Sequence, residues 1–281
     1  MRGWRTPVFL VLAVACSSDR NDPGTPPPIP DLLYTTTLDR AVALNWSDNA
    51  YTSDPANFGH YRVYSTSLIG TTGCAESWRL EGTTVAPEFL AGAMTNGVTR
   101  CFAVSAASVN GAESALSGAR ADTPRPDSRN VLVFARQVQN AESGFRFWDD
   151  LNSDGLAQDT ELGLVRQGSA ANIDFSVERD GTGALFLAPV RAGTGVELYS
   201  EAPVEDLTSI TAAAHATYRT SAIEASPGFG YVFEMVAADQ SFRYGALRVT
   251  HVGQSFLIFD WALQTDPGNP ELLVGTRSAA K

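Results

Sequence analysis

The sequence predicts an all-β protein with two domains in series, a β-sandwich followed by a second β-rich domain that is sandwich-like or barrel-like. Apolar residues alternate with polar ones in short runs, which is the pattern of half-buried strands. Glycine-containing turns separate these runs, and no heptad stripe or long amphipathic helix interrupts them. With 281 residues, 44% of them hydrophobic, the chain is long enough for two cores of ordinary size.

The first fifteen residues are typical of a bacterial lipoprotein signal. Arg2 and Arg5 give a positive start, and residues 8–15 form a short apolar segment before Cys16. The AVAC sequence ending at this cysteine resembles a lipobox, although the family usually has leucine where this chain has its first alanine. An ordinary secretory peptide is the alternative, whereas a membrane span needs about 20 apolar residues. We expect Cys16 to carry a lipid that holds the protein in the cell envelope. Because Ser17 is not the aspartate that retains lipoproteins at the inner membrane, the outer membrane is implied for a Gram-negative cell.

The segment after this cysteine predicts a tether, and the charge restricts the partners. Residues 16–30 are polar and then proline-rich, a composition typical of a semi-rigid spacer. The net charge is −11, and it becomes two units more negative when Arg2 and Arg5 leave with the signal. An acidic surface argues against nucleic acid as a partner. We therefore expect membrane contact through the lipid anchor, and a protein, a glycan or a haem-like molecule as the ligand.

Residues 31–124 contain about seven short strand-like runs, which suits a β-sandwich. Val42, Leu44 and Trp46 fall on one face of an expected strand. The segment resembles a fibronectin type III domain, and the resemblance is carried by Trp46, YRVYS at 61–65, Leu90, FAVSAASVNGAES at 102–114 and the closing ADTP at 121–124. This resemblance implies a spacer or binding module without catalytic residues. In one departure from the family, Arg100 stands where its corner tyrosine is expected.

Two cysteines remain besides the one in the lipobox. Cys74 and Cys101 form an even pair in an oxidising compartment, so we expect a disulfide between them. In the chain-entropy model, closing this loop stabilises the fold by about 3 kcal/mol. Two separate buried thiols are the alternative.

Residues 125–130, with their prolines and charges, are expected to be a linker before a second domain over residues 131–281. The strand-like runs of this domain are residues 131–135, 145–148, 173–178, 184–188, 231–236, 246–252 and 256–263. Several of them are apolar on both faces, as expected for strands inside a sandwich or a closed barrel.

This second domain resembles the HmuY-type haem-binding lipoproteins. IDFSVERDGTGALF at 173–186, DLTSIT at 206–211 and the stretch 231–264 carry the resemblance, which implies haem as a ligand. His215, His251 and Met235 are the candidate axial ligands, although neither histidine aligns with a ligand position of the family. The alternative is that both are ordinary surface or turn histidines.

The segment DLNSDGLAQDTE, residues 150–161, matches the twelve-residue calcium-loop pattern at every required position. A hard cation takes six to eight oxygen ligands. In this pattern they come from Asp150, Asn152, Asp154, the carbonyl of Leu156 and a bidentate Glu161. The flanks look like strands rather than helices, which predicts a structural calcium loop of an extracellular β-module, with a Kd on the order of 10⁻⁴ to 10⁻³ M. A solvated acidic turn is the alternative.

Enzyme motifs are lacking. The sequence contains no HExxH, GxSxG, GxxxxGK[ST] or GxGxxG pattern, and no closely spaced cysteine pair for zinc. The leading hypothesis is a non-enzymatic, lipid-anchored binding or scaffolding protein of the cell envelope. Haem or small apolar ligand capture by the second domain is the alternative, and a surface carbohydrate-active enzyme rests on analogy alone.

Overall fold

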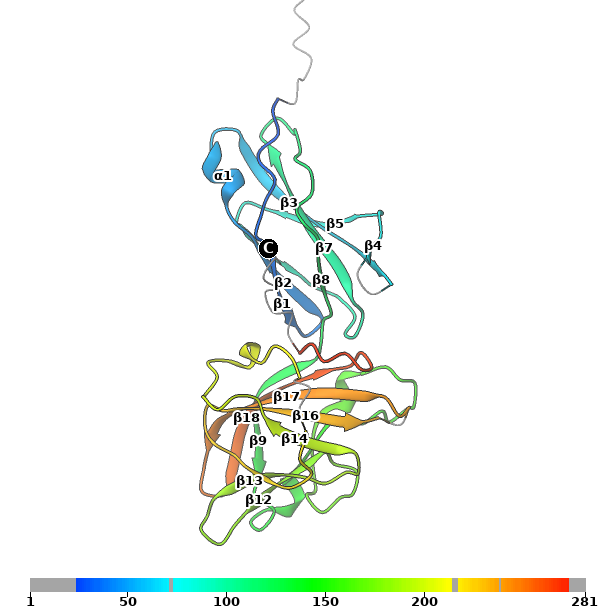
Figure 1. Cartoon of the computed structure of the whole chain (residues 1–281), viewed down its shortest axis with the longest axis vertical. Helices are drawn as coiled ribbons and strands as arrows, with labels where there is room; N and C mark the ends of the chain where they lie inside the picture. Colours follow the sequence, from blue (N-terminus) through cyan, green and yellow to red (C-terminus); the bar gives the residue numbers. More distant parts are fainter. Residues whose placement is uncertain (1–23, 71–72, 214–216, 238, 273–281) are drawn as a thin grey trace, which may run out of the picture.

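The computed structural model of the chain describes residues 24–70, 73–213, 217–237 and 239–272. Within these residues the protein is almost entirely β-structure, arranged as two domains that follow each other along the long axis (Figure 1). This confirms the predicted all-β, two-domain class. Cys16, the signal over residues 1–15 and His215 lie outside the described residues.

The N-terminal domain is a sandwich of antiparallel sheets. One sheet has the strand order β1-β2-β6, and the other has the order β4-β3-β7-β8, with β5 also paired to β3. Their elements are β1 (Tyr34–Leu38), β2 (Ala41–Asn45), α1 (Asn49–Ser53), β3 (Phe58–Ile69), β4 (Gly73–Cys74), β5 (Arg79–Thr84), β6 (Glu88–Ala91), β7 (Arg100–Ser108) and β8 (Arg120–Asp122).

The predicted alternation fills the core of this sandwich. Val42 and Leu44 alternate with more exposed neighbours along β2, and both are fully buried. The rings of Trp46 and Tyr61 meet edge to face with their centroids 5.2 Å apart, a favoured aromatic geometry. Phe58 packs on the same tyrosine at 4.8 Å, so three aromatic rings hold the two sheets together.

A disulfide joins Cys74 to Cys101, as predicted. It connects the short edge strand β4 to the central strand β7. Next to it, Arg100 donates a hydrogen bond from Nη2 to the Ser65 hydroxyl of β3 at 2.7 Å. The bridge and this hydrogen bond therefore tie β3, β4 and β7 together near the position where the family tyrosine is absent.

The described part of the predicted tether lies along the N-terminal domain. Residues 24–30 have no regular secondary structure, but Pro27 and Pro30 are buried. Asn57 Nδ2 donates to the Thr25 carbonyl at 3.0 Å, and Asn49 Nδ2 donates to the Ile29 carbonyl at 2.8 Å. Any free spacer after Cys16 is therefore shorter than residues 16–30.

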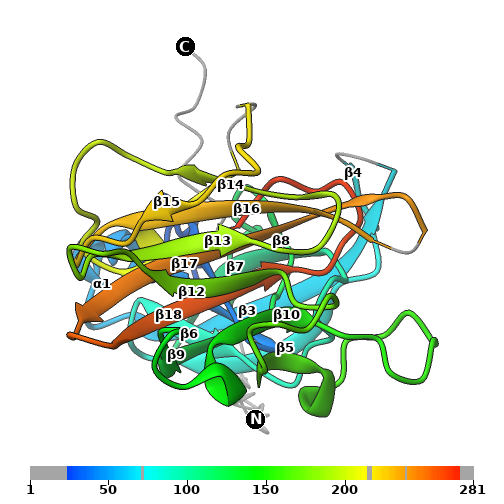
Figure 2. The same cartoon turned by 90° about the horizontal axis from the view of Figure 1, so that it is seen from below.

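The C-terminal domain is a second antiparallel sandwich, with two five-stranded sheets. Their orders are β11-β10-β12-β13-β15 and β14-β16-β17-β18-β9. Figure 2 shows this domain from below, in front of the N-terminal one. The elements are β9 (Asp127–Phe134), β10 (Gly144–Trp148), β11 (Leu162–Arg166), β12 (Phe175–Arg179), β13 (Leu185–Pro189), β14 (Thr194–Leu198), β15 (Ile223–Glu224), β16 (Gly230–Val236), β17 (Phe242–Val252) and β18 (Phe256–Gln264), with the 3-10 turns η1 (Asn140–Glu142), η2 (Asp159–Glu161) and η3 (Leu207–Ser209).

Two apolar clusters explain why several of these strands are apolar on both faces. Between the sheets, aromatic rings pack together, among them Phe145, Phe147, Phe175 and Phe233. A smaller cluster covers the outer face of β16, β17 and β18 and includes Leu207, Ile210 and Leu272 from segments that cross this face. Both faces of this sheet are therefore buried.

The segment between the domains differs from the predicted linker over residues 125–130. Residues 123–126 are buried, and β9 already begins at Asp127. The Arg125 amide donates to the Leu38 carbonyl of β1 at 3.1 Å, and the Pro126 carbonyl accepts from the Leu263 amide of β18 at 3.0 Å. Because its backbone is hydrogen-bonded to both domains, this segment is a built-in connection and not a flexible linker.

Among the described residues, no helix is long and apolar enough to cross a membrane.

Candidate functional site

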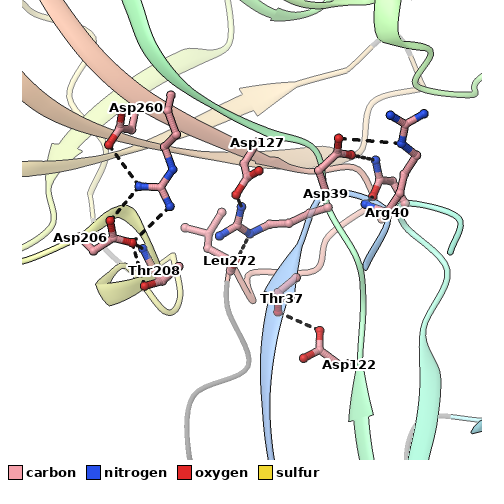
Figure 3. Close-up of polar contacts among 12 residues, drawn as sticks. Thr37, Asp39, Arg40, Asp122, Asp127, Asp206, Thr208, Asp260 and Leu272 are labelled. Atoms are coloured by element: carbon pink, nitrogen blue, oxygen red, sulfur yellow. Dashed lines mark hydrogen bonds and ion pairs between the residues drawn. The ribbon is translucent and has the colours of Figure 1, made fainter. Parts of the chain in front are cut away.

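The domain junction is built around Arg125, whose side chain is 0% exposed. Its Nε donates to the Leu272 carbonyl, and its Nη1 lies 3.6 Å from the Asp127 carboxylate (Figure 3). Burial lowers the pKa of Arg125 to about 10 and raises the pKa of Asp127 above its usual value. Desolvation is the main cause of both pKa shifts. The opposite charge of the partner makes each shift smaller. A buried charge of this kind depends on its partner.

The N-terminal domain also approaches the C-terminal domain closely through a glycine. The Gly97 amide donates to the Pro124 carbonyl at 2.8 Å, and Gly97 has a φ of +76°. A Cβ atom there would lie 2.6 Å from the Thr265 hydroxyl at the end of β18. A side chain at this position would push the two domains apart.

Beside the junction, Arg129 of β9 holds two segments of the C-terminal domain together. It donates to the Asp206 carboxylate at 2.8 and 3.2 Å and to Asp260 of β18 at 3.2 Å (Figure 3). Asp206 also accepts from the Thr208 amide at 2.9 Å and so caps η3. Hydrogen bonding from Arg129 holds the pKa of Asp206 well below its usual value.

The predicted calcium loop connects β10 to η2, and its oxygen atoms face its own backbone. The Asp154 amide donates both to Asp150 Oδ1 at 3.1 Å and to Asn152 Oδ1 at 3.0 Å. Gly155, with a φ of +71°, donates to Asp150 Oδ2 at 3.1 Å. Glu161 is 2% exposed and accepts from the Leu151 amide at 3.0 Å. The loop is thus folded around its acidic side chains, with Leu156 exposed.

In the described part of the chain, few positive charges lie close enough to offset the negative charges of the carboxylates in this loop. Among the described residues, Asp150, Asp154 and Glu161 form no ion pair with an arginine. Within the same part of the chain, no three His, Cys, Asp or Glu side chains stand close enough together to hold a metal ion. Asp159 lies 3.3 Å from Arg40 of the β1–β2 turn, so the loop contacts the N-terminal domain through one exposed pair.

A cavity of about 490 Å³ opens beside this loop at one end of the C-terminal sandwich. Asp150, Ser153 and Gly155 of the loop contribute to its lining. The other lining residues come from several strands and turns, and they are Arg146, Phe147, Trp148, Asp149, Asp174, Arg191, Met235, Ala237, Asp239, Arg243 and Leu263.

A buried carboxylate organises this cavity. Asp174, which is 1% exposed, accepts from Arg191 Nη2 at 2.9 Å and from the Phe147 amide at 2.8 Å. Arg146 lies 3.5 Å from the same carboxylate. Burial raises the pKa of Asp174 and lowers the pKa of Arg146, while their mutual attraction opposes both shifts. These side chains fix one wall of the cavity.

Of the haem candidates, Met235 and His251 do not come together, and His215 lies outside the described residues. Met235 is 3% exposed and lines the cavity, opposite Arg243 on β17. His251 is exposed, packs on Phe256 with ring centroids 5.7 Å apart, and lies eight residues farther along β17 than Arg243. That spacing corresponds to roughly 25 Å, which is too far for both to ligate one iron.

Sequence reasoning located the acidic loop but missed the junction and the cavity. Trp148 and Asp174 both lie in strand-like runs predicted from the sequence, and the structure places Trp148 at the end of β10 and Asp174 just before β12. An aspartate among the apolar residues of a predicted strand is a signal that could have indicated a buried charge, because such a group requires a partner. The arginines that supply the partners follow no local motif.

No family model matches the chain, and no curated protein matches it. Among solved structures, an Fn3-like protein from Clostridium thermocellum is 21% identical over 34% of this chain and 92% of its own, with a TM-score of 0.27. A protein described as FN3tt is 17% identical over 34% of this chain and 96% of its own, with a TM-score of 0.26. A DUF4466 family protein from Parabacteroides merdae is 11% identical over 84% of this chain and 99% of its own, with a TM-score of 0.40. The strand pairing described above, and not these similarities, defines the two sandwiches.

Proposed function

We propose that this protein is a lipid-anchored binding protein of the cell envelope, in which the N-terminal sandwich holds the C-terminal sandwich in a fixed position. The single observation that carries this proposal is the domain junction. The connecting segment is hydrogen-bonded to both domains, and the buried Arg125 contacts Leu272 and Asp127 of the second one. A fixed junction suits a spacer that presents a ligand-binding domain.

The anchor is tested by fatty-acid labelling in a Gram-negative host. The wild-type chain is expected to incorporate labelled palmitate and to fractionate with membranes, because Cys16 ends a lipobox-like sequence. A Cys16→Ser variant should lose both properties, whereas Cys74→Ser serves as a matched cysteine control that keeps the label. Labelling that persists in Cys16→Ser rules out this anchor.

The acidic loop supports a structural calcium site as part of this proposal. Every donor that it offers is an oxygen, which fits a hard cation. Its carboxylates at Asp150, Asp154 and Glu161 lack ion-pair partners among the described residues. Together with Asn152 and the carbonyl of Leu156, they would hold the ion after the loop closes around it, because no three acidic side chains of the described residues stand close enough in the present loop conformation. Bound calcium would offset two of the three negative charges and fix one side of the cavity.

Calcium is expected to raise the thermal unfolding midpoint of the protein. With a Kd of about 1 mM, 10 mM calcium stabilises the folded state by about 1.4 kcal/mol, equivalent to roughly 3–6 °C for a domain of this size. The shift, measured by calorimetry against chelator, should be absent in Asp154→Ala. Asp180→Ala, in an exposed turn of the same domain, is the control that keeps it. Equal shifts in wild type and Asp154→Ala would exclude the site.

A further inference from the structure

We propose that the cavity at the end of the C-terminal sandwich binds a neutral, hydroxyl-rich ring, such as one sugar residue of a neutral glycan. This inference rests on the binding role proposed above and specifies its ligand. The volume of about 490 Å³ falls within the range of about 300–1,000 Å³ that is usual for small-molecule sites.

One side of the cavity is apolar. Phe147, Met235 and Leu263 line it, and each is nearly completely buried in the sandwich. The Trp148 ring lies next to them. The guanidinium carbon of Arg243 is 5.8 Å from the centroid of this ring. The three buried side chains form the floor of the cavity, and the partly exposed Trp148 ring can cover the C–H face of a sugar ring, since contact removes apolar surface from water.

The charges of the lining disfavour an anion. Three arginines line the cavity, and each already has a carboxylate partner. Arg191 is 2.9 Å from Asp174, Arg146 is 3.5 Å from Asp149, and Arg243 is 3.3 Å from Asp239. These three carboxylates balance the three arginines, and Asp150 adds a fourth carboxylate when no calcium is bound to the loop. An acidic ligand would therefore meet no free cation.

The polar groups favour a ligand with hydroxyl oxygens. Two donors on lining residues, Trp148 Nε1 and Arg243 Nε, are covered and have no hydrogen-bond partner among the described residues. Buried donors of this kind are rarely left unpaired. A hydroxyl or ring oxygen reaching this wall would accept from them once the side chains adjust. The same hydroxyl groups would donate to the partly buried carboxylate of Asp149 and, when no calcium is bound, to that of Asp150.

The test is saturation-transfer NMR with the full chain and a panel of probes. The neutral probes are glucose, galactose, mannose, xylose and their common disaccharides, and the comparison probes are glucuronate and haemin. At least one neutral sugar is expected to bind saturably, with a Kd on the order of 1 mM for a single ring. Trp148→Phe keeps the ring but removes its N–H, and Arg243→Lys keeps the charge but removes Nε. Each should weaken binding by about 3- to 10-fold, whereas Arg179→Lys, at the exposed end of β12, should not.

The thermal unfolding midpoint of each variant is measured as well. This distinguishes a variant that has lost its fold from one that has lost a hydrogen bond to the sugar. If no neutral sugar saturates, if glucuronate or haemin binds more tightly than every neutral sugar, or if both cavity variants bind like wild type, the proposed ligand class is wrong. These outcomes are separate from failure of the anchor or the calcium loop, which are measured by palmitate labelling and by the calcium-dependent midpoint.

Discussion

Asp127→Asn is expected to lower the free energy of unfolding by about 3 kcal/mol, equivalent to about 6–12 °C in the unfolding midpoint. The reason is that Arg125, with a side-chain exposure of 0%, would remain at the junction without its carboxylate. Breaking one side of a buried ion pair costs more than the pair itself contributes, because the remaining charge is desolvated. The measurement is thermal and urea unfolding of the full chain.

Two further variants separate this effect from ordinary surface electrostatics. Asp159→Asn removes an exposed carboxylate that pairs with Arg40 at 3.3 Å, and it should cost less than about 0.5 kcal/mol. Arg125→Met combined with Asp127→Asn removes the unpaired charge and should recover part of the loss. If Asp127→Asn were as mild as Asp159→Asn, Arg125 would not depend on Asp127 and the account of the junction would be wrong.

Removal of the disulfide is expected to destabilise the N-terminal domain by about 3 kcal/mol. In Cys74→Ala combined with Cys101→Ala, the loop between β4 and β7 is no longer closed in the unfolded chain. The double variant avoids a free thiol, and alanine suits the fully buried position of Cys101. Calorimetry should show a lower midpoint for unfolding of this domain.

The disulfide prediction has a direct chemical control. Reduction of the wild-type protein should lower its midpoint by the same amount, whereas the reductant should have no effect on the double variant. A double variant as stable as the oxidised wild type would contradict the stabilising role of the bridge.

The strands of both domains could be predicted because their signals are local. The alternation around Val42 and Leu44 marks β2, and the long apolar run from Phe256 marks β18. The pairing of β18 with β9 could not be predicted in the same way, because it joins segments from opposite ends of the C-terminal domain. For the same reason residues 125–130 were interpreted as a linker. Their composition is that of a loop, and contacts with Leu38, Leu263 and Leu272 from distant parts of the chain accompany the burial of Arg125 and Pro126.

The two candidate sites differ in the same respect, because one is made of neighbouring residues and the other of residues far apart in the sequence. The acidic loop was located from the sequence because all its oxygen donors lie within twelve residues. The cavity was not, because Arg146, Asp174, Arg191 and Arg243 come from four separate parts of the sandwich. Each is an isolated charge in its own segment, and only the fold turns them into ion pairs. The two described haem candidates are not brought together, because Met235 of β16 pairs with Arg243 and His251 lies eight residues farther along β17.

The central claim is that the N-terminal sandwich holds the C-terminal sandwich in a fixed position. It is tested most directly by ¹⁵N relaxation of the unlipidated Cys16→Ser chain. Amides in β2, β3 and β7 and amides in β16, β17 and β18 are expected to report one common rotational diffusion tensor, as for a single elongated body. Separate, shorter correlation times for the two sets would show that the domains reorient independently and would contradict the claim.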